Sequence, residues 1–358
     1  MMSDIVIFIV VLAVLVLAHE FGHFIAARRK GVRVEEFGFG FPPRLFGFQK
    51  GETFYSFNLL PLGGFVKISG ENDVDSSDPR NFASHGVRTR ASILSAGVFF
   101  NIILAFIIFS SAVSIGMPVD AGDPLWSGRV RDKAVTVVEI LPESAAETAG
   151  LIIGDKILSL EADAARVVTT GVSDVHEFTV NHAGRPIKIE IDRNGQKNIL
   201  SAVLSENKIA PLGVATAEIG KIDVPWYKIP WVGLELTFLT AWRTLGGFFH
   251  IFQMLFSGQS VAGFISGPVG IFSIVSGSID MGLAVIMSLV AVLSINLAII
   301  NLIPIPGLDG GHLLFLAVEA ARGRPVGRKI SGLAHAAGFA ILIMLMLVVT
   351  YLDIKLRL

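Results

Sequence analysis

The stretch VLAHEFGHFIA, residues 16–26, contains two histidines and a glutamate at a spacing that can support chemistry. If this stretch is helical, His19 and His23 lie one turn apart on the same face, with their Cβ atoms about 6 Å from each other. Two imidazoles at that spacing can bind one zinc ion, and Glu20 then lies beside them as a general base. The three residues therefore predict a zinc site with His19 and His23 as ligands.

These ionisable residues lie in a segment that is otherwise typical of a membrane span. The 358 residues are 52% hydrophobic and only 16% charged, whereas soluble domains have roughly 25% charged residues. Ile5 to Ala27 reaches the length of about 20 residues that a span requires. Ionisable groups inside a span are expensive and are functional by default. The alternative is a snorkelling or interfacial cluster at the end of this span.

A zinc site needs a third protein ligand, and the stretch NLAIINLIPIPGLDGGHLLF, residues 296–315, offers one. Asp309 is a carboxylate at membrane depth, and Pro304 and Pro306 interrupt the helix before it. Non-helical backbone at this depth is tolerated only where protein or a wet cavity surrounds it. Taken alone, the stretch would be a helix break before a cytoplasmic loop. His312, three residues after Asp309, would be a loop histidine, with a supporting hydrogen bond to a metal ligand as the alternative. Together with HExxH, it makes Asp309 the candidate third ligand.

Long uncharged segments predict four spans, at about residues 5–27, 91–119, 282–308 and 332–352. The loop from Arg28 to Arg90 contains ten Lys and Arg, and four more lie between Arg322 and Lys329. Both loops are therefore expected to be cytoplasmic, with the N-terminus, residues 120–230 and the C-terminus outside. Asp309 reaches the depth of His19 only if the uncharged stretch Thr244–Ile279 does not cross completely. That stretch is therefore predicted to be interfacial or re-entrant.

The two motifs resemble those of the site-2 protease family of intramembrane zinc metalloproteases, especially its bacterial regulator-of-sigma-E protease group. Residues 19–23 match its HExxH motif, residues 301–311 resemble its NxxPxPxLDGG motif, and PLGGFVKISGE (61–71) extends the similarity over most of the chain. The resemblance implies one Zn²⁺ per chain, held by His19, His23 and Asp309, with Glu20 as the catalytic base. It also implies that Asn301 helps to hold the substrate or the oxyanion.

The resemblance further implies the substrates and the location. The substrates would be single-span membrane proteins already trimmed outside by another protease, such as an anti-sigma factor, or signal-peptide remnants, with a stress response as the output. The protein would be a multi-pass protein of the bacterial inner membrane. Its active site would lie near the cytoplasmic side, and a PDZ-like domain would be periplasmic.

Two further modules are expected outside the spans. TVVEILPESAAETAGLIIGDKILSLE (136–161) resembles the GLxxGDxI signature of bacterial PDZ domains, although the following EADAARVV lacks the usual turn glycine. Asn194-Gly195 between alternating segments predicts a hairpin. Such a domain either binds an extended peptide by strand addition or is a structural cap without a ligand. The Phe-rich cytoplasmic loop predicts a β-element that dips toward the membrane, with a packed soluble hairpin as the alternative.

The predicted fold class is a polytopic α-helical membrane protein with four transmembrane helices, a membrane-associated β-sheet and one extracytoplasmic PDZ-like α/β domain. The expected boundaries are a first transmembrane helix with HExxH at 1–30, a cytoplasmic β-loop at 31–90, transmembrane helix 2 at 91–119, the PDZ-like domain at 125–210, an interfacial or re-entrant segment at 225–280, transmembrane helix 3 at 281–320 and transmembrane helix 4 at 330–353.

The expected partners are the membrane protein substrates, the lipid bilayer and a peptide ligand of the PDZ-like domain. A net charge of −1 gives no indication of a nucleic-acid partner, and the absence of cysteine excludes disulfides and cysteine chemistry. Two other classes remain open, a membrane transporter and a non-catalytic PDZ scaffold. A transporter would not require HExxH spacing, and a scaffold would explain neither Glu20 nor Asp309.

Overall fold

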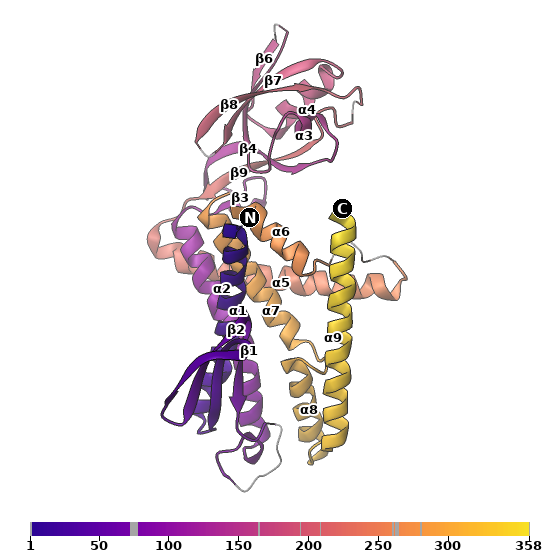
Figure 1. Cartoon of the computed structure of the whole chain (residues 1–358). Coiled ribbons are helices and arrows are strands. Elements are labelled where there is room, and N and C mark those ends of the chain that lie inside the picture. The colour runs from indigo at the N-terminus through magenta and orange to yellow at the C-terminus, as the bar shows by residue number, and fades with distance from the viewer. Residues whose placement is uncertain are drawn as a thin grey trace. The chain divides into compact units, whose positions relative to one another are not determined.

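The computed structural model describes residues 2–357, with gaps at 72–77, 164, 194, 208, 260, 262–264 and 280. The chain divides into two compact units. The first comprises Met1–Ser111, Pro230–Gly282 and Ile286–Leu358, and the second comprises Ala112–Ile229 and Leu283–Val285. Figure 1 shows the elements of both units coloured along the chain.

In the part of the chain that the structure describes, seven helices of eleven residues or more belong wholly or mainly to the first unit. They are α1 (Met2–Arg29), α2 (Val87–Ser114), α5 (Ile229–Phe256), α6 (Pro268–Ile279), α7 (Leu283–Leu302), α8 (Asp309–Arg322) and α9 (Arg328–Arg357). Among the described residues, four helices are long and apolar enough to cross a membrane: Met2–Arg29, Val87–Ser114, Leu283–Leu302 and Lys329–Lys355. The predicted number of four candidate spans is therefore confirmed.

Two segments differ in detail from the sequence-based expectation. The third predicted span is broken, because α7 ends at Leu302 and α8 begins at Asp309 after an irregular segment that contains both prolines. The stretch Thr244–Ile279 contributes to two helices, α5 and α6, and neither is among the four candidate spans. A proline at the first position of α6 explains why a helix restarts there, because proline has no N–H to lose from the first turn.

Helices α1 and α2 approach closely, because glycine occupies the contact. A Cβ added to Gly22 would lie 2.4 Å from the carbonyl oxygen of Ala96, so no larger residue fits there. Toward the C-terminal end of α1, Phe24 and Ala27 pack with Ile93 and Leu94 of α2 in one buried cluster. Helix α1 is therefore held directly against α2, and the two helices are seen in Figure 1.

Strands β1 (Val34–Lys50) and β2 (Thr53–Ile68) form a sheet beside α1, seen at the indigo end of the chain in Figure 1. Each strand is bent, so that Phe37 pairs with both Tyr55 and Val66. The second half of β1 pairs with the first half of β2, Phe48 opposite Tyr55. The sheet therefore has four rows, and the segment 64–68 of β2 forms one outer edge.

The second unit is a seven-stranded antiparallel sheet in the order β3-β9-β4-β5-β7-β8, with β6 paired to β5. Its elements are β3 (Pro118–Asp120), β4 (Val130–Ile140), α3 (Ala145–Thr148), β5 (Lys156–Ala162), β6 (Ala165–Val168), α4 (Val172–Asn181), β7 (Pro186–Arg193), β8 (Gln196–Val203) and β9 (Val214–Ile222). Short 3-10 helices lie at Phe82–Ser84 in the first unit and at Pro124–Trp126 and Trp226–Lys228 in the second unit.

The turns of the second unit show how its motifs fold. Strands β7 and β8 pair up to Arg193 and Gln196, as the hairpin pattern predicted, while Asn194 itself lies outside the described residues. Asp163 takes a left-handed conformation (φ 52°) between β5 and β6. Aspartate is among the residues that tolerate this conformation, so it can replace the turn glycine that the sequence lacks.

The Gly-Asp turn before β5 is held by a buried ion pair. Asp155 is fully buried, and both of its carboxylate oxygens lie 2.7 Å from guanidinium nitrogens of Arg193. The carboxylate also accepts the main-chain N–H of Ile152, and the Arg193 guanidinium donates to the carbonyl of Gly150. The carboxylate of Asp155 therefore raises the pKa of Arg193 and ties the Gly150–Gly154 loop to β7.

Candidate metal centre

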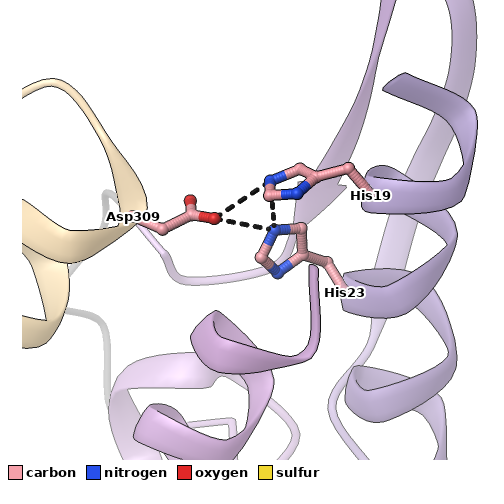
Figure 2. A group of neighbouring side chains, drawn as sticks. All are labelled: His19, His23 and Asp309. Atoms are coloured by element: carbon pink, nitrogen blue, oxygen red, sulfur yellow. Dashed lines mark hydrogen bonds and ion pairs between the residues drawn. The ribbon is translucent and has the colours of Figure 1, made fainter. Parts of the chain in front are cut away.

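His19 and His23 extend from α1 toward α2 and α8, as Figure 2 shows. They are 6% and 7% exposed, so neither imidazole is a solvated surface group. Their Nε2 atoms lie 3.2 Å apart, as expected for residues one turn apart on one helix face. The two histidines of HExxH are therefore brought together at one buried point.

Asp309 reaches this point because α8 starts immediately after the proline-containing break. A Cβ added to Gly310 would lie 2.2 Å from the carbonyl oxygen of Ile303, and one added to Gly311 would lie 2.5 Å from that of Ile305. Only glycine lets α8 begin so close to the preceding loop. The paired glycines after Asp309 therefore set the position of its carboxylate.

Helix α9 holds the same loop from the other side. The main-chain N–H of Gly307 donates to Nδ1 of His335 over 3.0 Å, and a Cβ added to Gly338 would lie 1.8 Å from the carbonyl oxygen of Pro306. His335 also stacks on His312, with ring centroids 3.9 Å apart. His312 lies on α8, so the expectation of a loop histidine was wrong: the helix restarts at Asp309 and includes it.

Three ligand atoms converge at the centre. Asp309 Oδ2 lies 3.0 Å from His19 Nε2 and 3.2 Å from His23 Nε2 (Figure 2). Ligand atoms placed 2.0–2.1 Å from a tetrahedral zinc ion are separated from one another by about 3.3 Å. The observed separations of 3.0–3.2 Å therefore fit a shared zinc ion.

The position of the imidazole proton on His23 also supports a shared metal ion. The Nδ1 of His23 lies 2.9 Å from the carbonyl oxygen of Ile93, which can only accept, so the imidazole proton sits on Nδ1. When the ring is neutral, the lone pair of Nε2 then faces Asp309. Although Asp309 Oδ2 is buried close to both nitrogens, no hydrogen bond of acceptable geometry reaches it from the described residues. Converging lone pairs repel one another unless a cation lies among them.

Helix α2 leaves space for the imidazoles at Gly97. A Cβ added there would lie 2.4 Å from His23 Nε2 and 2.9 Å from His19 Nδ1. The missing side chain is therefore what allows the two rings to face Asp309. The donor set, the separations and this recess all fit a zinc ion.

The two remaining predicted site residues lie around the centre. Glu20 is half-buried on α1 beside the outer edge of the β1–β2 sheet, where a Cβ added to Gly64 would lie 3.6 Å from Glu20 Cγ. Asn301 is half-buried at the C-terminal end of α7. Among the described residues, the group of His, Asp and Glu side chains that could hold a metal ion is His19, His23 and Asp309.

Sequence reasoning missed the groups that orient these ligands. The carbonyl of Ile93, the recess at Gly97 and the side chain of His335 come from α2 and α9, far from HExxH in the chain. Gly97, a glycine in an uncharged span, was a signal in the sequence that another group could approach this helix closely. Nothing in the sequence showed which helix it faces.

Comparison with known proteins identifies the family. Residues 7–345 match the model of peptidase family M50. The chain is 31% identical to the zinc metalloprotease RasP of Geobacillus kaustophilus, over 99% of this chain and 98% of that protein. It is 34% identical to a putative zinc metalloprotease of Rhizobium meliloti, over 97% and 95% of the two chains. A putative zinc metalloprotease of Clostridium perfringens is 31% identical over 95% of each chain.

The chain therefore belongs to peptidase family M50, the site-2 proteases. It is a multi-pass inner-membrane zinc metalloprotease that carries out intramembrane proteolysis. The predicted family, enzyme class and Zn²⁺ cofactor are confirmed.

Proposed function

We propose that His19, His23 and Asp309 bind the zinc ion and that Glu20 is the general base for hydrolysis of peptide bonds in the transmembrane segments of single-span proteins. The observation that carries this proposal is the convergence of Asp309 Oδ2 and two Nε2 atoms within 3.2 Å of one another. These atoms come from two helices separated by nearly the whole chain. Their meeting in a buried position makes a chance ion pair a poor explanation.

A zinc ion held by His19, His23 and Asp309 would supply a Lewis acid and would activate water near pH 7. The carboxylate of Glu20 accepts the proton of the attacking water and later donates it to the nitrogen of the leaving amine. The Glu20 carboxylate is close enough to interact electrostatically with His19, His23 and Asp309, which supports this role. Asn301, at the end of α7, would hold the substrate carbonyl through its amide N–H₂ group as charge develops on the oxygen.

A helical peptide bond is closed to attack, so the substrate must be extended before cleavage. The outer edge of the β1–β2 sheet, residues 64–68, provides main-chain groups for pairing with an extended peptide. Gly64 on this edge lies beside Glu20. A substrate strand added here would therefore run past the general base.

A pocket beside this sheet would accept an apolar substrate side chain. It has a volume of about 310 Å³ and is lined by Leu17, Phe37, Phe39, Phe48, Tyr55, Ser56 and Phe57. Leu17 comes from α1, three residues before Glu20, so the pocket lies between the HExxH helix and the sheet. The lining favours the large apolar residues that are frequent in transmembrane segments.

The two modules outside the spans would control access. The second unit would be a periplasmic PDZ-like domain at about residues 125–210 that excludes intact ectodomains or binds a peptide. The abundance of Lys and Arg between α1 and α2 supports a cytoplasmic position for the β1–β2 sheet and for the active site. The segment 225–280 would lie at the membrane interface, since Trp231, Phe238 and Trp242 of α5 are 71%, 72% and 68% exposed.

The natural substrates would be single-span proteins already shortened by another protease, such as an anti-sigma factor, or signal-peptide remnants. Their cleavage would start an envelope stress response. If no membrane-protein fragment accumulates in cells that carry an inactive enzyme, this assignment of substrates is wrong.

The test of the site is cleavage of a tagged single-span protein in proteoliposomes, with zinc content measured in each variant. Glu20→Gln should abolish cleavage and retain zinc, whereas Asp309→Asn should lose both cleavage and most of the zinc. Glu139→Gln, a change of the same type on β4 of the second unit, is the matched control and should behave as the wild type. Cleavage that persists in Glu20→Gln would overturn the proposed role of Glu20.

A further inference from the structure

Asn101 of α2 is a fully buried polar residue next to the metal centre that the proposed reaction does not use. The residue is 0% exposed, and its Nδ2 lies 3.4 Å from Nδ1 of His19. Its Oδ1 has no hydrogen-bond partner among the described residues. A buried amide oxygen without a partner is destabilising, whereas a leucine of similar size would fill the space at less cost. The position of this amide therefore needs an explanation.

The tautomer that His19 must adopt to bind a metal ion explains why an amide lies at this position. His19 presents Nε2 to the centre, 3.0 Å from Asp309 Oδ2. A nitrogen that binds metal offers its lone pair, so the imidazole proton must sit on the other nitrogen, Nδ1. The group that faces Nδ1 must then be an acceptor. His23 follows this rule already, because its Nδ1 donates to the carbonyl of Ile93.

The amide of Asn101 can meet the same requirement. Its oxygen and nitrogen ends have nearly the same shape, so the surrounding donors and acceptors decide which end faces His19. With Oδ1 toward His19, the amide oxygen gains the donor that Nδ1–H provides. With Nδ2 toward His19, two donors face each other. The protonation required for metal binding therefore selects the first arrangement.

The backbone around Asn101 is itself held in place. Ser294 of α7 is fully buried and donates its hydroxyl to the carbonyl oxygen of Asn101 over 2.8 Å. Gly97, which makes room for both imidazoles, lies one turn earlier on the same helix face. Asn101 therefore has a fixed main chain from which its side chain can orient His19.

The geometry points to Asn101 as a positioning residue that accepts the Nδ1–H of His19 and thereby directs its Nε2 lone pair toward the zinc ion. This inference rests on the proposed role of His19 as a ligand. Outer hydrogen bonds of this kind usually change metal affinity by 10- to 100-fold. The effect of removing this one should appear in metal binding as well as in proteolysis.

The test uses the full-length protein in detergent and measures zinc affinity by competition with a chelator. Asn101→Leu should weaken zinc binding by about 10- to 100-fold, while Asn101→Asp, which keeps an acceptor, should stay within a few-fold of the wild type. The visible absorption of the Co²⁺-loaded protein should change in Asn101→Leu and not in Asn101→Asp. Thr237→Val removes a buried hydroxyl of α5 and is the matched control, expected to bind zinc as the wild type does.

Thermal unfolding of the metal-free protein separates positioning from general packing. Asn101→Leu should leave the metal-free Tm unchanged or higher, and lower only the increase in Tm that zinc causes. Unchanged zinc affinity in Asn101→Leu, or a metal-free Tm lowered as much as the zinc-bound Tm, would overturn the inference. Weaker binding in Asn101→Asp than in Asn101→Leu would also overturn it, because the amide would then be a donor.

A His19→Ala variant distinguishes this inference from the proposed function. If His19→Ala retains zinc at wild-type affinity, the ligand assignment itself is wrong. If His19→Ala loses zinc while Asn101→Leu binds it normally, the ligand assignment stands and only the role of Asn101 fails.

Discussion

Gly97→Ala is the smallest change that the structure predicts to damage the metal centre. The added Cβ would lie 2.4 Å from His23 Nε2, 2.7 Å from His19 Cε1 and 2.9 Å from His19 Nδ1. Ordinary contacts begin at 3.4 Å, so the nearest ring must move by about 1 Å. Metal–ligand distances tolerate changes of about 0.2 Å. The variant cannot keep both imidazoles in place without separating α1 from α2.

The expected magnitude follows from this displacement. A shift of about 1 Å in a catalytic group costs on the order of 100-fold in rate, and we expect a similar loss in zinc affinity. The assay is chelator competition for zinc, together with cleavage of the tagged substrate in proteoliposomes. The metal-free Tm, followed by tryptophan fluorescence, reports whether the helices still pack.

Gly247→Ala is the matched control, because a Cβ added to this glycine of α5 meets no described atom within 4 Å. It should leave zinc affinity and cleavage unchanged and, if anything, stabilise the helix, since alanine is the better helix former. Gly97→Ala protein that binds one zinc ion with wild-type affinity would refute the assignment of this cluster as the metal centre.

Three further predictions concern the surroundings of the site. Gly338→Ala places a Cβ 1.8 Å from the carbonyl oxygen of Pro306, so it should displace the loop before Asp309. Zinc binding measured by chelator competition should weaken at least 10-fold, as when a hydrogen bond to a metal ligand is removed. A wild-type zinc affinity would show that α9 does not position this loop. Burial raises the pKa of Glu71 to about 7, helped by the charges of Asp309 and Glu20 and opposed by His23. This folded-state pKa lies above the ordinary glutamate pKa of 4.5. Glu71 therefore stabilises the fold below pH 4.5, and up to about 3 kcal/mol should be lost as the pH rises through 7. Glu71→Gln should remove the resulting decline in Tm between pH 5 and 8, and an unchanged pH profile would contradict this prediction. Asp155→Asn breaks the buried ion pair with Arg193 and should lower the free energy of unfolding of the second unit by about 3 kcal/mol in denaturant unfolding. The zinc content should stay unchanged. Loss of zinc as well would show that the two units are coupled.

The sequence alone determined the chemistry of the ligands. HExxH specifies two imidazoles one helical turn apart, because helical geometry relates residues i and i+4 whatever the rest of the chain does. The apolar context strengthened the prediction of a metal site, since ionisable groups inside a membrane span are costly and are usually functional. The number of candidate spans was also readable, because span length and composition are local properties.

The break between Leu302 and Asp309 was readable only in part. Two prolines predicted an interruption, and the structure shows that a new helix starts at Asp309 instead of a cytoplasmic loop. The restart depends on Gly310 and Gly311 packing against the carbonyls of the loop. Steric fit of this kind depends on neighbours that only the folded chain supplies.

Tertiary structure alone decided which groups orient the ligands. The partners of the two imidazoles, the Ile93 carbonyl and the Asn101 amide, lie 70 and 82 residues away from them in the chain. A main-chain carbonyl carries no sequence signal, and an asparagine in a span does not reveal which helix it faces. Hydrogen bonds between helices depend on how the helices rotate and approach, which is set by packing at residues such as Gly22 and Gly97.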